Sequence, residues 1–210
     1  MERYRWYHAF LFTTGDPTRA VRLVHSSTEP DDPNAQAIHG LFLYATRQFA
    51  EAERVLKHAI YLDIHCWVGN LGLALVYLAM NDFRKAFVYY RGVLDSLAEI
   101  KSPDTMPGLG TICVYRYEST TPEKKEEFLR AANTTIEAKY LSSPALQKSL
   151  IALALGDTEN CIGNLEGAWR DHEPIMLWLP VWPIFDPLRE QPRFEKLLGR
   201  IKLAIGRHPV

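Results

Sequence analysis

The sequence repeats itself with a period of 34 residues, and this feature constrains the fold more than any other. Segment 33–66 aligns with segment 67–100 without a gap, and the shared positions carry small or large apolar side chains in the same order. The aligned pairs are Gly40 with Ala74, Leu43 with Tyr77, Phe49 with Phe83, Ala52 with Ala86, Leu56 with Tyr90, and Ala59 with Val93.

A turn signature recurs near both ends of the chain. Gly15-Asp16 and Gly156-Asp157 are followed by small and apolar residues at the same offsets, and Asn81-Asp82 takes their place in the middle. A glycine can end one helix in a left-handed conformation, and an aspartate can cap the next helix. We therefore expect tight antiparallel helix pairs.

The apolar spacing predicts an all-α protein, because no stretch between turn signals alternates apolar and polar residues long enough for a sheet. Ser102-Pro103, Pro107-Gly108 and Gly110 interrupt the 34-residue period, so the region around 100–121 should be irregular. The expected helices lie at about 2–13, 17–28, 34–46, 49–62, 66–80, 83–99, 108–117, 122–140, 143–155, 158–171 and 191–204.

These aligned positions resemble the tetratricopeptide repeat (TPR) family. In that family small residues let two helices approach closely, and large apolar residues fill the space between repeats. Four segments occur in order in the second half of the chain: Tyr140–Pro144, Leu153–Asp157, Asn164–Trp169 and Phe185–Phe194. Together they resemble the C-terminal TPR region of bacterial signalling and transcription regulators.

The resemblance implies a TPR-like α-solenoid of antiparallel helix pairs with a C-terminal capping helix. One domain would cover residues 1–210, with repeats at about 1–32, 33–66, 67–100 and 142–175, an irregular part at 101–141, and a capping segment at 176–210. Stretch Pro180 to Pro192 should lie across the last helix pair. Helix 191–204 should close the core with one apolar side, made of Phe194, Leu197, Leu198 and Ile201.

Composition argues against several classes of function. Lys and Arg number 24 against 25 Asp and Glu, so the chain offers no broad attraction to nucleic acid or to anionic lipid. Cys66, Cys113 and Cys161 lie too far apart for a disulfide framework or a zinc knuckle, which fits a reducing compartment. The apolar runs Ala9 to Phe12 and Cys66 to Met80 are short for a signal peptide and a membrane helix respectively. We expect a cytoplasmic protein without nucleic-acid or membrane partners.

Two clusters of ionisable residues are weak candidates for chemistry. His65-Cys66 is the nearest match to a metal pair, but adjacent helical residues point in different directions. Asp171 and Glu173 flank His172 at a helix end, but no nucleophile can be identified beside this cluster. No catalysis, metal or cofactor is therefore expected. Among the tryptophans, Trp178 and Trp182 are the best candidates for a role outside the core.

The concave face of the expected solenoid is the candidate binding surface. In the TPR family the first helix of each pair lines this face, and the resemblance places the partner-binding residues at Leu41, Tyr44, Leu71, Leu75 and Leu78, with Leu146, Leu150 and Leu153 added by the last repeat. Such an apolar groove suits an amphipathic helix or a hydrophobic peptide of another protein. We therefore expect a non-catalytic adaptor or regulatory module.

Two alternatives stay open. The groove leucines could pack against later helices of the same chain, in which case the groove is filled. The array could also be a sensory or oligomerisation segment of a larger bacterial regulator, so that identical chains associate.

Overall fold

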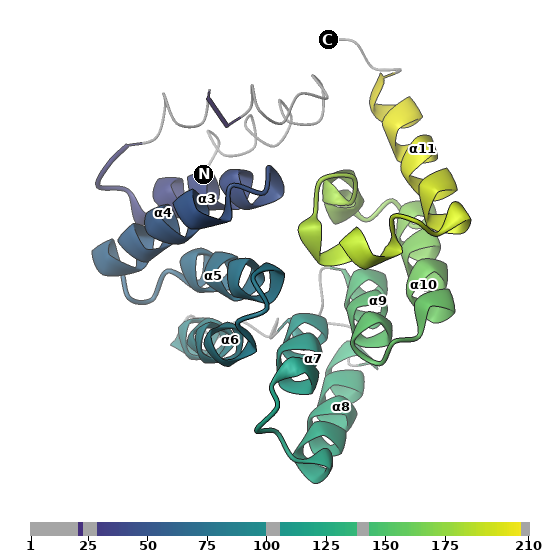
Figure 1. The fold of residues 1–210 in the computed structure, drawn as a ribbon, viewed down its shortest axis with the longest axis horizontal. Coiled ribbons are helices and arrows are strands. Elements are labelled where there is room, and N and C mark those ends of the chain that lie inside the picture. The colour runs from purple at the N-terminus through teal and green to yellow at the C-terminus, as the bar shows by residue number, and fades with distance from the viewer. Residues whose placement is uncertain (1–20, 23–28, 100–105, 138–142, 207–210) are drawn as a thin grey trace.

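The computed structural model describes residues 21–22, 29–99, 106–137 and 143–206 (Figure 1). Within these ranges every regular element is a helix and no strand occurs, which confirms the all-α prediction. The expected first repeat, at about 1–32, lies almost wholly outside the described residues.

Successive helices pack as neighbouring pairs that follow one another around a curve (Figure 1). The pairs are α3 with α4, α5 with α6, α7 with α8, and α9 with α10, and two 3₁₀ helices and α11 follow them. Their bounds are α3 Pro33–Ala45, α4 Phe49–Leu62, α5 Trp67–Ala79, α6 Phe83–Glu99, α7 Pro107–Arg116, α8 Pro122–Glu137, α9 Pro144–Ala154, α10 Thr158–Arg170, η1 Pro174–Trp178, η2 Pro183–Leu188 and α11 Pro192–Gly206.

The 34-residue period of the sequence reappears in the first two complete pairs. Helices α3 and α5 begin 34 residues apart, at 33 and 67, and α4 and α6 begin 34 residues apart, at 49 and 83. Ala52 and Ala86, which the alignment equates, are both fully buried, as expected for small residues where helices cross. The pair α9–α10 uses the same pattern, because Cys161, Leu165 and Ala168 are fully buried at the corresponding offsets.

One type of turn ends four helices. Arg47, Asn81, Gly156 and His172 all have left-handed backbone conformations, with φ of 62°, 59°, 76° and 56°. At each turn the next residue's N–H donates to a carbonyl five residues earlier, as Gln48 donates to Leu43 and Asp82 to Tyr77. This is the Schellman arrangement, which satisfies the last carbonyls of a helix and reverses the chain. Only the third of these turns has the expected glycine at the left-handed position.

Helix α7 lies within one residue of the predicted 108–117, although Pro107-Gly108 and Gly110 interrupt the 34-residue period. Pro107 is the first residue of the helix, and both glycines lie inside it. A Cβ atom on Gly108 would lie 2.5 Å from the carbonyl oxygen of Gln147 on α9. The glycines therefore let α7 and α9 pack closely together, which outweighs their low helix propensity.

The C-terminal segment closes the core and also reaches across the curve. Phe194, Leu197 and Ile201 on α11 are buried against α10 and the 3₁₀ segment, as the apolar side of this helix predicts. The stretch from Pro180 to Pro192 was expected across the last helix pair only. It packs there, but η2 also contacts α5, and Asp186 pairs with Arg47 after α3. No described helix is long and apolar enough to cross a membrane.

Candidate functional site

Leucines at helical spacing line the inner side of the curve. Leu71, Leu75 and Leu78 stand at positions i, i+4 and i+7 of α5, so they share one face of that helix. Leu146, Leu150 and Leu153 repeat the spacing on α9. In both rows the first two leucines line one cavity and the third lines a second cavity.

The first of these, which we call the apolar cavity, has a volume of about 440 Å³. Its lining residues are Ile38, Leu41, Phe42, Trp67, Val68, Leu71, Leu75, Met106, Leu109, Ser143, Leu146, Gln147, Leu150, Trp178, Trp182 and Ile184. Besides the indole N–H groups of the three tryptophans, only Ser143 and Gln147 among them have polar side chains. The Gln147 side-chain oxygen accepts a hydrogen bond of 2.8 Å from the Gly108 N–H, so part of that amide is already used.

Residues of the C-terminal segment form one wall of the apolar cavity. The Trp178 ring packs edge-on against Phe42 of α3, with ring centroids 5.4 Å apart and an interplanar angle of 87°. Asp186 of η2 accepts a 2.6 Å ion-pair contact from Arg47. The chain itself therefore covers part of the concave face, and a cavity remains beneath the cover.

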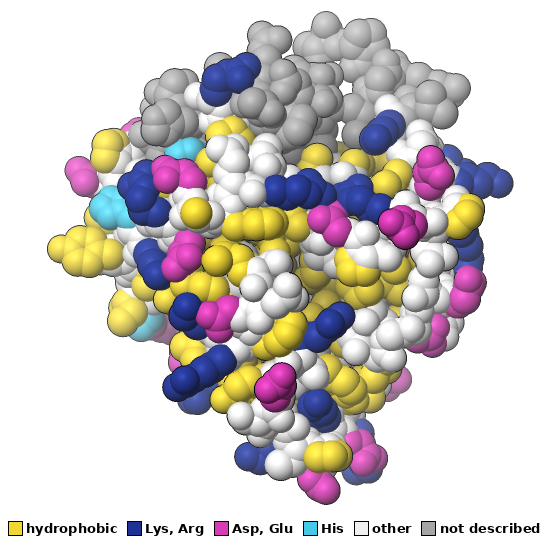
Figure 2. Space-filling model, viewed as in Figure 1, with side chains coloured by type: hydrophobic (Ala, Val, Ile, Leu, Met, Phe, Trp, Pro, Cys, Tyr) yellow, Lys and Arg dark blue, Asp and Glu magenta, His cyan; other side chains and the backbone are white. Residues whose placement is uncertain are grey.

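The second cavity, which we call the arginine cavity, has a volume of about 310 Å³ and lies toward the C-terminal ends of the first helices. Its lining residues are Tyr44, Arg47, Phe49, Leu78, Ala79, Asn81, Phe83, Ile112, Arg116, Leu153, Pro183, Ile184, Asp186 and Pro187. Ile184 belongs to both cavities. Figure 2 shows apolar side chains gathered in a hollow at the middle of this face, with Lys, Arg, Asp and Glu side chains around it.

Positive charge exceeds negative charge in the arginine cavity. Arg47 and Arg189 both contact the same oxygen of Asp186, at 2.6 Å and 2.5 Å, so two guanidinium groups share one carboxylate. Arg116 forms no ion pair with a described carboxylate, and its guanidinium lies 5.9 Å from the centre of the Phe83 ring. One arginine of the cavity is thus left without a counter-charge in this part of the chain.

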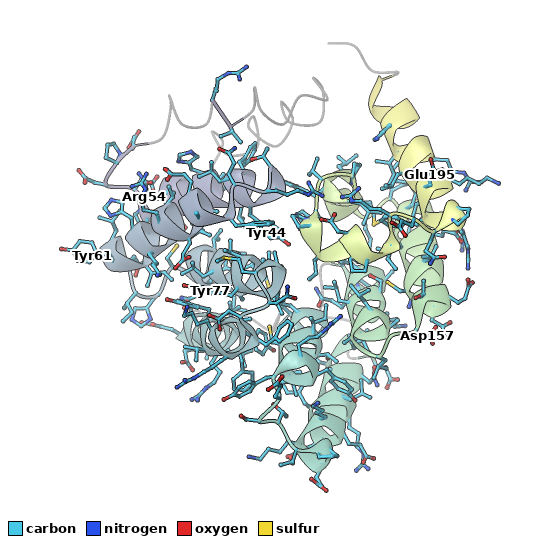
Figure 3. All side chains as sticks on the ribbon, viewed as in Figure 1. Tyr44, Arg54, Tyr61, Tyr77, Asp157 and Glu195 are labelled. Carbon is cyan, nitrogen blue, oxygen red and sulfur yellow. The ribbon has the colours of Figure 1, made fainter. Side chains whose placement is uncertain are left out.

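Tyr44 contributes a buried polar atom to the same cavity. Its ring lies between α3 and the C-terminal segment (Figure 3). Its hydroxyl lies near the Ile184 backbone, but it makes no hydrogen bond of acceptable geometry within the described residues. Burial raises the pKa of this hydroxyl far above its ordinary value, so it stays protonated. An unpaired buried hydroxyl costs free energy, and a ligand oxygen could reach this one only if neighbouring groups moved.

The five residues predicted for partner binding therefore divide between two cavities. Leu41 and Leu71 are partly exposed and line the apolar cavity together with Leu75, which is only 5% exposed. Tyr44, which is buried, and Leu78, which is partly exposed, line the arginine cavity. The tryptophans singled out from the sequence, Trp178 and Trp182, also line the apolar cavity.

Sequence reasoning missed Arg116 and Ile184. Arg116 stands in the last turn of a helix whose register the 34-residue period does not determine, and Ile184 lies in an irregular segment without periodicity. No signal in the sequence relates either residue to α5.

The ionisable clusters noted in the sequence have structural partners. His65 pairs with Glu99 at 2.5 Å on the surface, while the buried Cys66 thiol lies 3.7 Å from the Pro33 carbonyl oxygen. Burial raises the pKa of the Cys66 thiol. The Glu173 carboxylate accepts the N–H groups of Ala145 and Leu146, which caps α9. No group of three or more metal-ligating side chains occurs in the described ranges.

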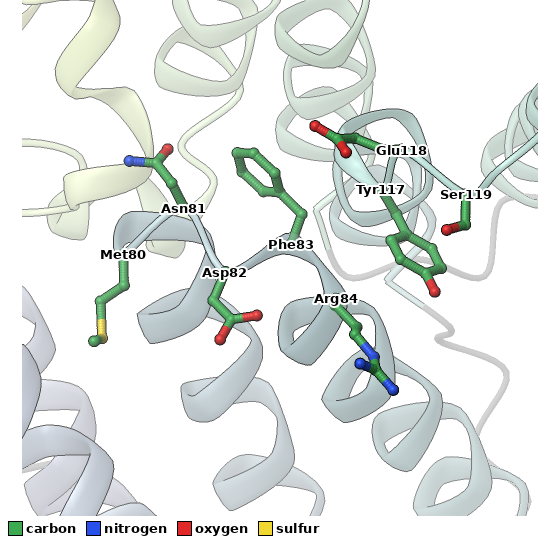
Figure 4. Close-up of a pocket in the computed structure, with 8 residues that line it drawn as sticks. All are labelled: Met80, Asn81, Asp82, Phe83, Arg84, Tyr117, Glu118 and Ser119. Carbon is green, nitrogen blue, oxygen red and sulfur yellow. The ribbon is translucent and has the colours of Figure 1, made fainter.

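A third depression, of about 620 Å³, lies between the α5–α6 and α7–α8 turns (Figure 4). Its lining is mixed, with Asp82, Arg84 and Glu118 beside Met80 and Phe83. The Asp82 carboxylate is already engaged by Lys85 at 2.8 Å, and this contact lowers the pKa of the carboxyl group. The two inner cavities, which share Ile184, are therefore the stronger candidate site.

Comparisons with known proteins add no assignment: no family model, no curated protein and no solved structure matches the chain.

Proposed function

We propose that this protein is a non-catalytic binding module of the TPR type, whose concave face takes up apolar side chains of another protein. The observation that carries the proposal is the apolar cavity on the inner side of the curve. Repeated first helices supply its leucines at equivalent positions, and its walls offer almost no polar groups. Recognition energy in interfaces concentrates where large side chains enter such desolvated pockets.

The TPR assignment is part of the proposal. Its support is the 34-residue spacing of helix starts, the shared left-handed turns, and the small residues buried where paired helices cross. In repeat proteins of this kind, the inner helices form an extended concave surface for partners.

A site-specific photo-cross-link tests the partner proposal. A cross-linking amino acid replaces Leu71, whose side chain lines the apolar cavity and is partly exposed, and the full chain is irradiated in its native host. We expect a defined protein to be captured from this position. A matched variant carries the same amino acid at Val88 on α6, which is 57% exposed and lies outside both cavities.

Capture from position 71 should be lost when Leu75→Asp or Leu41→Asp is introduced in a variant that still folds, because a charge would then face the partner's apolar side chains. Identical capture from positions 71 and 88, or none from position 71, would overturn the proposal.

A further inference from the structure

The apolar and arginine cavities lie next to each other along the inner helices, as the leucine rows show. On α5 the row runs from Leu71 and Leu75 in the apolar cavity to Leu78 in the arginine cavity. Ile184 faces both cavities from η2. A linear molecule lying along α5 would therefore stay in contact with apolar walls until it reached the arginines.

The apolar end is unsuited to a polar chain. Among the described residues, Ser143, Gln147 and the indole N–H groups of three tryptophans are the polar groups there, and Gln147 already binds the Gly108 N–H. An extended peptide placed in this cavity would leave backbone N–H and C=O groups without partners, which costs several kcal/mol for each group in an apolar medium. A polymethylene chain has no such groups, and a cavity of about 440 Å³ lies in the size range of small-molecule sites.

The described lining at the other end of the path has two exposed arginines, Arg47 and Arg116, and one carboxylate, that of Asp186. Arg116 pairs with no described carboxylate, and Arg47 shares Asp186 with Arg189. Arginine forms strong, charge-assisted hydrogen bonds with carboxylates.

We propose that the two cavities form one binding site for a free long-chain carboxylate, with its tail in the apolar cavity and its carboxylate group beside Arg116. The tail would occupy the wall assigned above to a partner's apolar side chains, so the ligand would compete with that partner. This last point alone rests on the proposed function.

The length of the path sets the length of the ligand. Val68 and Leu78 stand ten positions apart on α5, and at 1.5 Å per residue they are separated by about 15 Å. An extended polypeptide advances about 3.5 Å per residue, that is, over three backbone bonds. An extended hydrocarbon tail should likewise advance roughly 1.2 Å per bond. A tail of about 12 to 16 carbons therefore fits best.

The test is a titration of the delipidated full chain with tetradecanoate. The tetradecanoate concentration stays below the value at which micelles form, and tryptophan fluorescence reports binding. Trp67, Trp178 and Trp182 line the apolar cavity and report on its occupation. We expect saturable binding of one ligand per chain. From decanoate to tetradecanoate, affinity should rise about fourfold for each methylene, the equivalent of ~0.8 kcal/mol. Methyl tetradecanoate, which lacks the charge, should bind at least tenfold more weakly.

Two variants locate the ends of the ligand. Arg116→Gln should weaken tetradecanoate at least tenfold and leave the methyl ester unchanged, whereas Arg84→Gln, outside both cavities, should change neither. Leu71→Phe should fill part of the apolar cavity and weaken the acid and the ester together. Melting curves establish that each variant is folded.

Several outcomes would overturn the inference: no saturable binding, equal affinity for acid and ester, or an Arg116→Gln variant that binds tetradecanoate normally. If tetradecanoate fails to bind while position 71 captures a protein, this inference is wrong and the partner proposal stands. If tetradecanoate binds and position 71 captures no protein, the partner proposal is wrong and the ligand site stands.

Discussion

Individual glycines determine how closely the helices of this protein approach one another. A Cβ atom on Gly72 would lie 2.5 Å from the end of the Leu56 side chain, which can rotate or shift. A Cβ atom on Gly108 would lie at the same distance from the Gln147 carbonyl oxygen, which belongs to the backbone of α9 and cannot move alone. The two glycines therefore differ in what a substitution would displace.

Gly108→Ala should lower the free energy of unfolding by about 1 to 3 kcal/mol, because α7 must move away from α9. Gly167→Ala is the matched control, since this helical glycine has no atom within 4 Å of an added Cβ. That change should raise stability by roughly 0.5 to 1 kcal/mol through better helix propensity. Urea unfolding measures both values. If both variants change the free energy of unfolding by the same amount in the same direction, α7 and α9 do not pack as closely as described.

The helix pair is the element that the chain repeats, and its turn is made in several chemical ways. Gly156 adopts the left-handed conformation without a steric penalty, whereas His172 adopts it with a φ of 56° and a side chain present. A left-handed conformation costs a residue with a Cβ about 1 to 2 kcal/mol. Hydrogen bonds of the turn, such as that from the Glu173 N–H to the Ala168 carbonyl oxygen, compensate for this cost.

His172→Gly should therefore stabilise the protein by up to about 1 kcal/mol, because it removes the left-handed penalty and His172 is exposed. Gly156→Ala should destabilise the protein by about 1 kcal/mol for the opposite reason. Thermal unfolding of the two variants checks this prediction. A loss of stability in His172→Gly would mean that the imidazole makes a contribution that the turn geometry does not explain.

At the scale of the whole molecule, the C-terminal segment covers part of the inner face of the curve and so buries residues of that face. Trp178 packs on Phe42, Asp186 pairs with Arg47, and Ile184 faces both cavities. Leu75 is consequently 5% exposed, although it stands on the face where a partner was expected. Substitutions on this face should affect folding as well as binding.

Leu75→Asp should lower the free energy of unfolding by at least about 3 kcal/mol, since it buries a carboxylate without a partner. For a chain of this size, the melting temperature should fall by roughly 6 to 12 °C. Val88→Asp, at a position that is 57% exposed, should change stability by less than about 0.5 kcal/mol. If Leu75→Asp melts like the unaltered protein, the C-terminal segment does not cover the inner face.

Helix positions could be predicted from the sequence because their signals are local. The predicted 49–62 and 83–99 agree with the bounds of α4 and α6, and the capping helix begins one residue from its expected start, at Pro192. The positions of Leu41, Leu71 and Leu75 on one cavity also followed from repeat register. Each of these features depends on the spacing of residues within a few tens of positions, and that spacing can be read directly from the sequence.

The sequence by itself determined the helical class, the 34-residue period, the turns and the leucine rows on the inner helices. Only the tertiary structure decided whether those rows face solvent, because the answer depends on where Trp178, Ile184 and Asp186 pack more than 100 residues later in the chain. An irregular 3₁₀ segment has no periodicity from which a packing surface can be predicted. The proximity of Arg116 to Tyr44 likewise results from the stacking of separate helix pairs, and no local pattern records it.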